Sequence, residues 1–268
     1  MDIKVNGKPF ECAPGTTYLS LAKNFKDEYD APIVLAVENH KYRELFRPVK
    51  ADAEISFETV RDPAGNKSYK RSACMLMLKA FYDTVDASLI ERVKLEFSIS
   101  GSYYFTYKGN FTLDEKLLKD IKNRMDELVR ADIPFQKTQM PLSTALERFD
   151  EHGMSEKKKL FKYRRYSTVN VYNLNKYEDY YYGHMVPSTA YITAFDLQLY
   201  DEGFMLVLPD RGGSFEKVGT FVPSPKLFAT MKEATAWGEM LDVSCVADLN
   251  DCIANGGFPE LMLVQEAL

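Results

Sequence analysis

The first sixty residues carry the pattern that most narrows the folds open to this chain. Apolar and polar residues alternate over residues 3–5, directly before an Asn6-Gly7 pair. Such a pair is the strongest short-range signal for a two-residue hairpin turn. Apolar positions within 19–25 follow helical spacing, and the run 33–37 is apolar throughout, as in a buried strand. A further strand is expected at 54–57. Hairpin, helix and returning strands in this order predict a β-grasp fold.

The amino-acid sequence of this segment resembles that of a known module. It reads VNGKPF, then PGTTYLSLAKNF, then VLAVENHKYREL and ADAEISFET. This pattern resembles a TGS domain, the ubiquitin-like module at the front of threonyl-tRNA synthetases and some nucleoside kinases. We therefore expect a TGS domain over residues 1–62.

A second and larger α+β domain is expected over residues 63–223. Asp62-Pro63-Ala64-Gly65 reads as a linker, and a helix with one apolar face starts at Asn66. A strand at 93–99 and a long helix opened by the capping box Thr112-Leu113-Asp114-Glu115 follow. The later part predicts a helix from the capping box at 144–147 to Gly153, a helix from Ser155 through Arg165, and strands at 169–174 and 191–208.

The last segment, 224–268, is expected to be a helical connector. Helices are predicted from Pro225 through Trp237, over 242–255, and from Pro259 onwards. The final helix is still running at Leu268, which indicates that the chain continues into a further domain. The sequence contains no Gly-x-x-x-x-Gly-Lys-Ser/Thr motif, so phosphoryl-transfer machinery is not expected in these residues.

Three stretches of the larger domain carry a second resemblance. They read KSYKRSACMLMLKAFYD, IPFQKTQMPLSTALERFDEHGMSEKKKLFKYRR and YYGHMVPSTAYITAFDLQLYDEGFMLVLP. They are similar to the second additional domain of threonyl-tRNA synthetases, and especially to its version in bacterial TGS-containing uridine (nucleoside) kinases. This resemblance implies a non-catalytic binding or regulatory region, partnered by a C-terminal kinase domain of the same chain. ATP and magnesium are implied for that parent kinase, and no cofactor for this segment.

The same resemblance marks the positions of a degenerate metal site. The synthetase domain pairs a Cys-x-Gly-Pro-His-Val-Pro stretch with a His-x-x-x-His helix. The matching positions here are Tyr181, Met185, Arg71 and Met75. A phenol, a guanidinium and two thioethers are poor zinc donors, so neither a metal nor a catalytic residue is expected. His184 lies one place off the register. It could act as an acid or base, but a structural histidine donating one hydrogen bond is favoured.

A basic run offers a possible contact for phosphate. Its six cations are interleaved with aromatic residues and comprise Lys157, Lys158, Lys159, Lys162, Arg164 and Arg165. One reading is an anion or RNA site, because cations beside aromatic rings suit phosphates and bases. The other is a solvated helix face with Leu160 and Tyr163 turned inward. Nucleotide or RNA is therefore a candidate partner.

Charge and composition limit the partners and the cellular compartment that can be expected. The formal net charge is −5, so any nucleic acid must be held by a local patch rather than by the overall field. No stretch is long and apolar enough for a membrane span and the start lacks an export signal, which predicts a cytoplasmic protein without a membrane partner. The scattered cysteines, Cys12, Cys74, Cys245 and Cys252, are expected to be reduced thiols.

Two other functions stay open. The chain could be a free-standing aminoacyl-tRNA editing hydrolase with a rearranged site around His184 and Cys74. It could also be a purely structural or dimerisation module in which the old cleft is vestigial, and oligomerisation is possible in either case. Bound zinc together with hydrolysis that His184→Ala abolishes would favour the enzyme.

Overall fold

The computed structural model describes residues 1–151 and 155–267. The chain forms two compact units, Met1–Gln136 with Tyr172–Val222, and Lys137–Val171 with Pro223–Leu268. Helices and strands mix in both, so the expected α+β class is confirmed. The division expected at 1–62, 63–223 and 224–268 stays a prediction.

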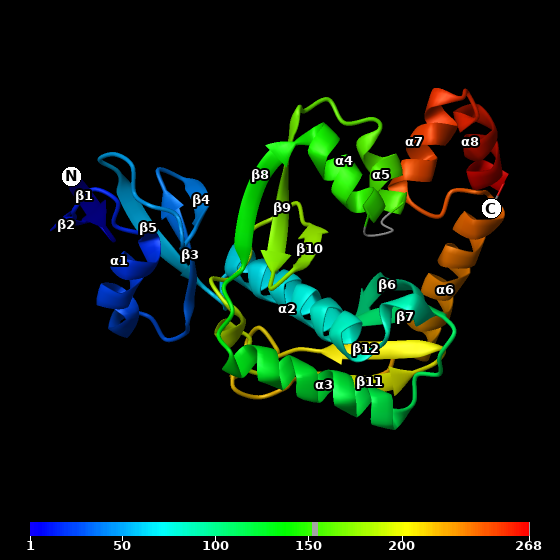
Figure 1. Ribbon diagram of the computed structural model, residues 1–268, viewed down its shortest axis with the longest axis horizontal. Coiled ribbons are helices and arrows are strands. Elements are labelled where there is room, and N and C mark those ends of the chain that lie inside the picture. Colours follow the sequence, from blue (N-terminus) through cyan, green and yellow to red (C-terminus); the bar gives the residue numbers. More distant parts are fainter. Residues whose placement is uncertain (152–154, 268) are drawn as a thin grey trace. The chain divides into compact units, whose positions relative to one another are not determined.

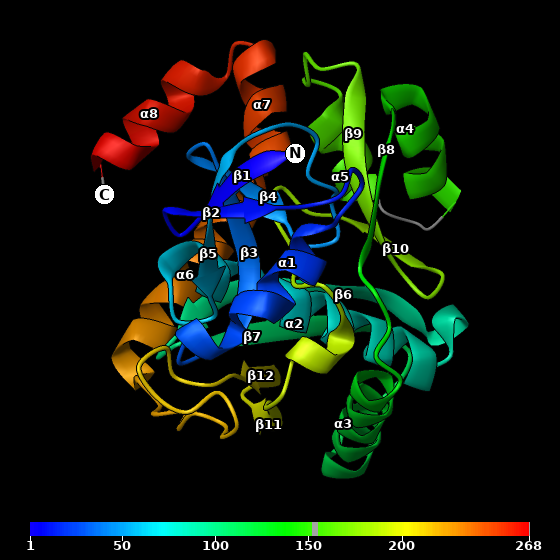
Figure 2. The same cartoon turned by 90° about the vertical axis from the view of Figure 1, so that its left-hand side faces the viewer.

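The first unit opens with a five-stranded sheet in the order β2-β1-β5-β3-β4. Its strands are β1 (Asp2–Val5), β2 (Lys8–Glu11), β3 (Ile33–Glu38), β4 (Lys41–Glu44) and β5 (Glu54–Thr59). The central pair β1 and β5 is parallel and the other pairs are antiparallel. Helix α1 (Tyr18–Phe25) lies across one face of this sheet (Figures 1 and 2). This order and the covering helix are those of the expected β-grasp.

Apolar spacing explains why α1 folds onto the sheet. Tyr18, Leu21, Ala22 and Phe25 are its buried residues, and they recur at the three- and four-residue intervals of one helix face. The Thr17 hydroxyl caps the helix by accepting the backbone N–H of Ser20 at 3.2 Å. The helix and the sheet share one apolar core.

The rest of the first unit packs two helices with a four-stranded sheet in the order β11-β12-β7-β6. The helices are α2 (Pro63–Thr84) and α3 (Glu115–Arg130), which contact one another. The strands are β6 (Ile90–Ile99), β7 (Ser102–Gly109), β11 (Asp196–Tyr200) and β12 (Gly203–Val207). Phe81 of α2 stacks on Phe204 of β12, which in turn stacks on Phe105 of β7, with ring centroids 6.0 and 5.4 Å apart. These rings lie in the larger apolar core.

Several expected boundaries in this unit are wrong. The residues predicted to be a linker begin α2, because Pro63 suits the first helical turn and Gly65 passes close to β5. A Cβ on Gly65 would lie 1.9 Å from the carbonyl oxygen of Thr59. Helix α3 is capped by Asp114, which accepts the N–H of Leu117 at 2.8 Å, and not by Thr112.

The single strand expected over 191–208 is also wrong. The chain makes a short 3-10 helix, η3 (Thr189–Tyr191), and then the hairpin of β11 and β12. Asp201 at the hairpin turn has a φ of 52°, a conformation that aspartate tolerates better than most residues. The sequence analysis also missed β7, which pairs with β6 and β12.

The second unit contains mainly helices. They are α4 (Leu142–Glu151), α5 (Ser155–Phe161), α6 (Pro225–Met240), α7 (Val246–Ala254) and α8 (Phe258–Ala267). Helix α5 contacts both α4 and α7, and Phe149 stacks on Phe161 with ring centroids 5.5 Å apart. Helix α4 begins before the predicted capping box, and its predicted end at Gly153 lies outside the described residues. Helix α5 ends at Phe161 and not at Arg165.

A three-stranded sheet has the order β10-β9-β8. It consists of β8 (Gln136–Pro141), β9 (Thr168–Leu174) and β10 (Tyr177–Tyr180), and the chain passes from the second unit back to the first within β9. Among the helices in the described part of the chain, none is both long and apolar enough to cross a membrane.

Candidate functional site

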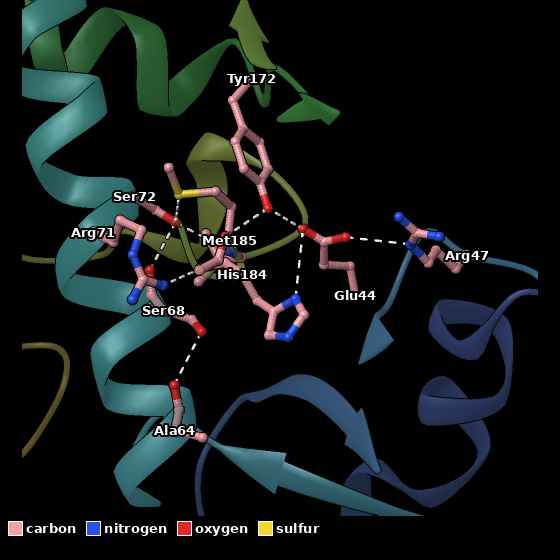
Figure 3. A network of polar contacts seen from close by, with 11 residues as sticks. Glu44, Arg47, Ala64, Ser68, Arg71, Ser72, Tyr172, His184 and Met185 are labelled. Carbon is pink, nitrogen blue, oxygen red and sulfur yellow. Dashed lines mark hydrogen bonds and ion pairs between the residues drawn. The ribbon is translucent and has the colours of Figure 1, made fainter. Parts of the chain in front are cut away.

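A polar network within the first unit joins four segments that are distant in sequence. Glu44 ends β4, Arg71 and Ser72 lie on α2, Tyr172 lies on β9, and His184 lies in the loop after β10. Figure 3 shows these side chains converging on Glu44 and on the backbone of the loop.

Glu44 is the buried anion of this network. Only 1% of its surface is exposed, although it carries a carboxylate. The Tyr172 hydroxyl donates to it, and Arg47 donates from Nε at 3.3 Å. Burial, followed by the neighbouring Glu44 charge, raises the pKa of Tyr172, so its hydroxyl keeps its proton at neutral pH. The tyrosine and the arginine thereby compensate a charge that would be costly to bury alone.

Two side chains of helix α2 hold the loop after β10 by contacting the backbone of the loop. Arg71 donates from Nη1 to the carbonyl of His184 at 2.6 Å. The Ser72 hydroxyl donates to the carbonyl of Ser68 at 2.8 Å and accepts the N–H of Val186 at 3.0 Å. These contacts fix the backbone on both sides of Met185, and they therefore fix where the His184 side chain leaves the loop.

His184 is partly open to solvent. About a third of its side chain is exposed, at 33%, while its Nδ1 is buried and lacks a hydrogen bond within the described residues. Nδ1 lies 3.8 Å from Oε1 of Glu44, an ion-pair distance. The structural hydrogen bond expected of this histidine is not made by Nδ1. An imidazole beside a buried carboxylate, with access to water, can take up and release a proton.

The four positions matched to metal ligands lie in or beside the core of the first unit. Met75 and Met185 are fully buried in the larger apolar core, and Tyr181 packs against it. Burial raises the pKa of Tyr181 well above its usual range. Arg71 instead points its guanidinium at Gly183 and His184. Within residues 1–151 and 155–267, no group of three His, Cys, Asp or Glu side chains could hold a metal ion. That the site binds no metal stays a prediction.

Cys74, which the hydrolase hypothesis placed beside His184, is a poor nucleophile in this structure. It is 6% exposed and belongs to the larger core. Burial raises the pKa of its thiol to about 12, so the reactive thiolate is scarce at neutral pH.

The basic run lies in the second unit, where several of its cations contact carboxylates. Lys158 pairs with Asp150 at 2.9 Å, Lys159 with Asp248 at 3.5 Å and Lys162 with Asp251 at 2.8 Å. Arg164 lies over the rings of Phe161 and Tyr166 at 5.1 and 5.8 Å. Arg165 is exposed. An anion or RNA site in the run Lys157–Arg165 stays a prediction, and these pairings reduce the charge that it presents.

Sequence reasoning missed Glu44, Arg47 and Tyr172. A signal for Glu44 exists in the hairpin register, which places it opposite the fully buried Leu35 of β3. A charged residue on a buried face is unusual and often functional. Tyr172 gives no comparable signal, because tyrosine is common in strands.

Comparison with known proteins finds threonine–tRNA ligases among the relatives of this chain. No family model matches the chain. A threonine–tRNA ligase of Desulforamulus reducens is 25% identical over 195 residues, covering 72% of this chain and 30% of the ligase. Those of Halorhodospira halophila and Syntrophotalea carbinolica are 29% and 28% identical over 155 and 168 residues, covering 58% and 61% of this chain and 24% and 26% of the ligases.

These relatives overturn the expected kinase parentage and support the resemblance to threonyl-tRNA synthetase. The prediction that the chain is the regulatory region of a uridine or nucleoside kinase is wrong, because the relatives are threonine–tRNA ligases. ATP and magnesium, which only that kinase implied, stay untested. The chain spans less than a third of the length of these ligases. It contains a region similar to part of a threonyl-tRNA synthetase.

Proposed function

We propose that this protein acts on aminoacyl-tRNA and hydrolyses the ester between the amino acid and the terminal ribose, with His184 as the general base. The β-grasp would then be a TGS domain, as its sequence predicts, and the protein would work in the cytoplasm. The relatives' name, threonine–tRNA ligase, supports tRNA and a hydroxyl-bearing amino acid as the substrate class. A continuous match over 72% of the chain includes the Tyr180–Thr189 segment wherever it starts.

The pairing of His184 with Glu44 is the observation that carries this proposal. His184 would take a proton from a water molecule whose oxygen attacks the ester carbonyl. The bond from that carbon to the ribose oxygen then breaks, and the imidazolium of His184 returns the proton to the ribose oxygen. Glu44 stabilises the imidazolium that forms, since its carboxylate lies 3.8 Å from Nδ1. Positioned acid–base groups of this kind contribute rate factors of about 10²–10⁴.

The supporting residues act through these two. Tyr172 and Arg47 hold Glu44 in place, and Arg71 holds the backbone of His184. They are positioning residues, because they contact Glu44 and the backbone of His184 rather than the reacting atoms. Cys74 has no role in this mechanism, in agreement with its burial.

The test is deacylation of tRNA charged with threonine or with its smaller hydroxyl analogue serine. His184→Asn is expected to lower kcat by about 10²–10⁴ without a matching rise in KM. His40→Asn is the matched control, because His40 is exposed in a hairpin turn, at a φ of 64° that asparagine accepts. Equal rates for wild type and His184→Asn would overturn the hydrolase.

The positioning role of Glu44 has its own readout. Glu44→Gln is expected to lower kcat with little change in KM, and Glu44→Asp to recover part of the rate. A purely structural role would instead lower thermal stability in both variants without separating kcat from KM. Tight tRNA binding without any deacylation would indicate a recognition module.

A further inference from the structure

The N-terminal β-grasp contains a cavity lined by three cationic side chains. Its volume is about 340 Å³, and it is lined by Tyr18, Glu38, Arg43, Arg47, Pro48 and Lys50. This volume falls within the range of sites that hold small ligands or ligand groups. The cations come from the end of β4 and the turn after it.

The charges around this cavity favour an anion. Arg43, Arg47 and Lys50 bring three positive charges, and Glu38 brings one negative charge. Glu44 adds a second negative charge behind Arg47, and the sum is still positive. Burial opposes ionisation of Glu38, but hydrogen bonds from Tyr18 and Arg43 outweigh it and lower the pKa of that carboxyl. The carboxylate therefore stays ionised and holds Arg43 in place rather than accepting a proton.

The arginines keep donors for a further acceptor. Arg43 contacts Glu38 through Nε at 2.8 Å, and Arg47 contacts Glu44 through Nε at 3.3 Å. A guanidinium has five N–H donors, so the terminal nitrogens of both side chains can serve another group. Lys50 is exposed, and in the described part of the chain no carboxylate lies within ion-pair distance of its Nζ. Planar guanidinium groups beside a lysine are a frequent arrangement for phosphate.

The wall that carries these cations is held by the backbone. Tyr18 donates its N–H to the carbonyl of Arg47 at 3.0 Å, and Leu19 donates to Leu45 at 2.7 Å. Val49 donates to the carbonyl of Thr16 at 2.9 Å. The turn 45–49 is therefore fixed to the start of α1 before any ligand binds, which lowers the entropy cost of binding.

The cavity is connected to the His184 site through Arg47. This side chain lines the cavity and also contacts Glu44, whose carboxylate approaches His184 (Figure 3). We propose that the cavity of Arg43, Arg47 and Lys50 binds a phosphate group, and that this phosphate belongs to the backbone of the tRNA whose ester reaches His184. The second part rests on the proposed function.

Binding of uncharged tRNA tests the site without any hydrolysis. The double variant Arg43→Gln/Lys50→Gln is expected to raise the Kd for tRNA about ten-fold, and to reduce the dependence of log Kd on log salt by about 1. Lys23→Gln/Lys26→Gln is the matched control, because it removes the same charge from the same domain outside this cavity. Arg47 is left intact in both, since it also contacts Glu44. An equal loss of affinity in the two double variants, or no loss in either, would overturn the proposal.

A second arm separates the sources of the phosphate. If inorganic phosphate binds to wild type but not to Arg43→Gln/Lys50→Gln, while tRNA affinity is equal in both, the phosphate site stands and the RNA assignment is wrong. Should the double variant fail to fold, Lys50→Gln alone still tests the site, because Lys50 is exposed. It is expected to raise the Kd about three-fold. Failure of His184→Asn to alter deacylation would reject the hydrolase and leave these binding results unaffected.

Discussion

The guanidinium of Arg71 occupies the space that a side chain on residue 183 would need. A Cβ on Gly183 would lie 2.3 Å from Cζ of Arg71 and 2.4 Å from its Nη1. The same Nη1 donates to the carbonyl of His184 at 2.6 Å. A side chain on residue 183 would therefore force the Arg71 guanidinium to move, and with it the donor that holds the His184 carbonyl.

Gly183→Ala is expected to displace the Arg71 guanidinium and to loosen the His184 loop. Loss of a hydrogen bond to a charged donor costs about 1.5–3 kcal/mol, so kcat for deacylation is expected to fall about ten-fold or more. Kinetics and thermal denaturation of the same preparation would measure this. Gly212→Ala is the control, because a Cβ there meets nothing within 4 Å. Wild-type kcat in Gly183→Ala would disprove the positioning role of Arg71.

Tyr172→Phe is expected to destabilise the first unit. The variant leaves the buried carboxylate of Glu44 without its hydroxyl donor, at a cost of about 1–3 kcal/mol in the free energy of unfolding. Urea denaturation followed by circular dichroism measures this. Tyr182→Phe removes the same hydroxyl from a residue that is 94% exposed, and it should leave the midpoint unchanged. If both variants unfold at the wild-type midpoint, the Tyr172 bond contributes no net stability.

Cys74→Ala is expected to retain deacylation, because the buried thiol is not a nucleophile. Its pKa is raised by burial from 9.0 to about 12, so the folded protein keeps the thiol protonated where the unfolded chain ionises it. The thiol therefore stabilises the fold fully below pH 9, and this contribution is lost as pH rises toward about 12. Wild type should lose stability faster than Cys74→Ala over this window, by up to about 1.4 kcal/mol per pH unit. A loss of activity as large as that of His184→Asn would instead indicate a thiol mechanism.

Two charge reversals separate structural from binding cations in the basic run. Lys162→Glu places a negative charge beside Asp251, its partner at 2.8 Å, and is expected to lower the melting temperature. Arg165→Glu changes an exposed cation and is expected to weaken tRNA retention without altering that temperature. Electrophoretic mobility shift and differential scanning fluorimetry measure both effects. Unchanged retention in Arg165→Glu would count against an RNA site in this run.

Local sequence rules predict much of this fold. Asn6-Gly7 specifies its hairpin because asparagine and glycine accept the positive φ values of that turn, here 50° and 78°. The rules fail where a tertiary contact decides. Gly65 is predicted to be a loop residue, but it lies in α2, where its close approach to β5 leaves no room for a side chain. The hairpin turn at Asp201 lacks the Asn-Gly sequence that usually marks such a turn.

The candidate site, too, is only partly predictable from the sequence. The resemblance identifies Arg71, Tyr181, His184 and Met185 as neighbours, and the contacts of Arg71 with the loop agree with it. It does not identify Glu44, because the bond from Tyr172 to Glu44 joins residues 128 positions apart. No periodicity or motif encodes a side-chain contact between strands of two different sheets at that separation.

The buried carboxylate beside His184 is supplied by β4 of the N-terminal sheet, whereas the histidine lies in the loop after β10 of the same unit. The N-terminal sheet is therefore part of the site and cannot be exchanged independently of it. Grafting an unrelated module in its place would strip the imidazole of its anionic neighbour, and a fragment beginning at residue 63 would carry the histidine without the acid.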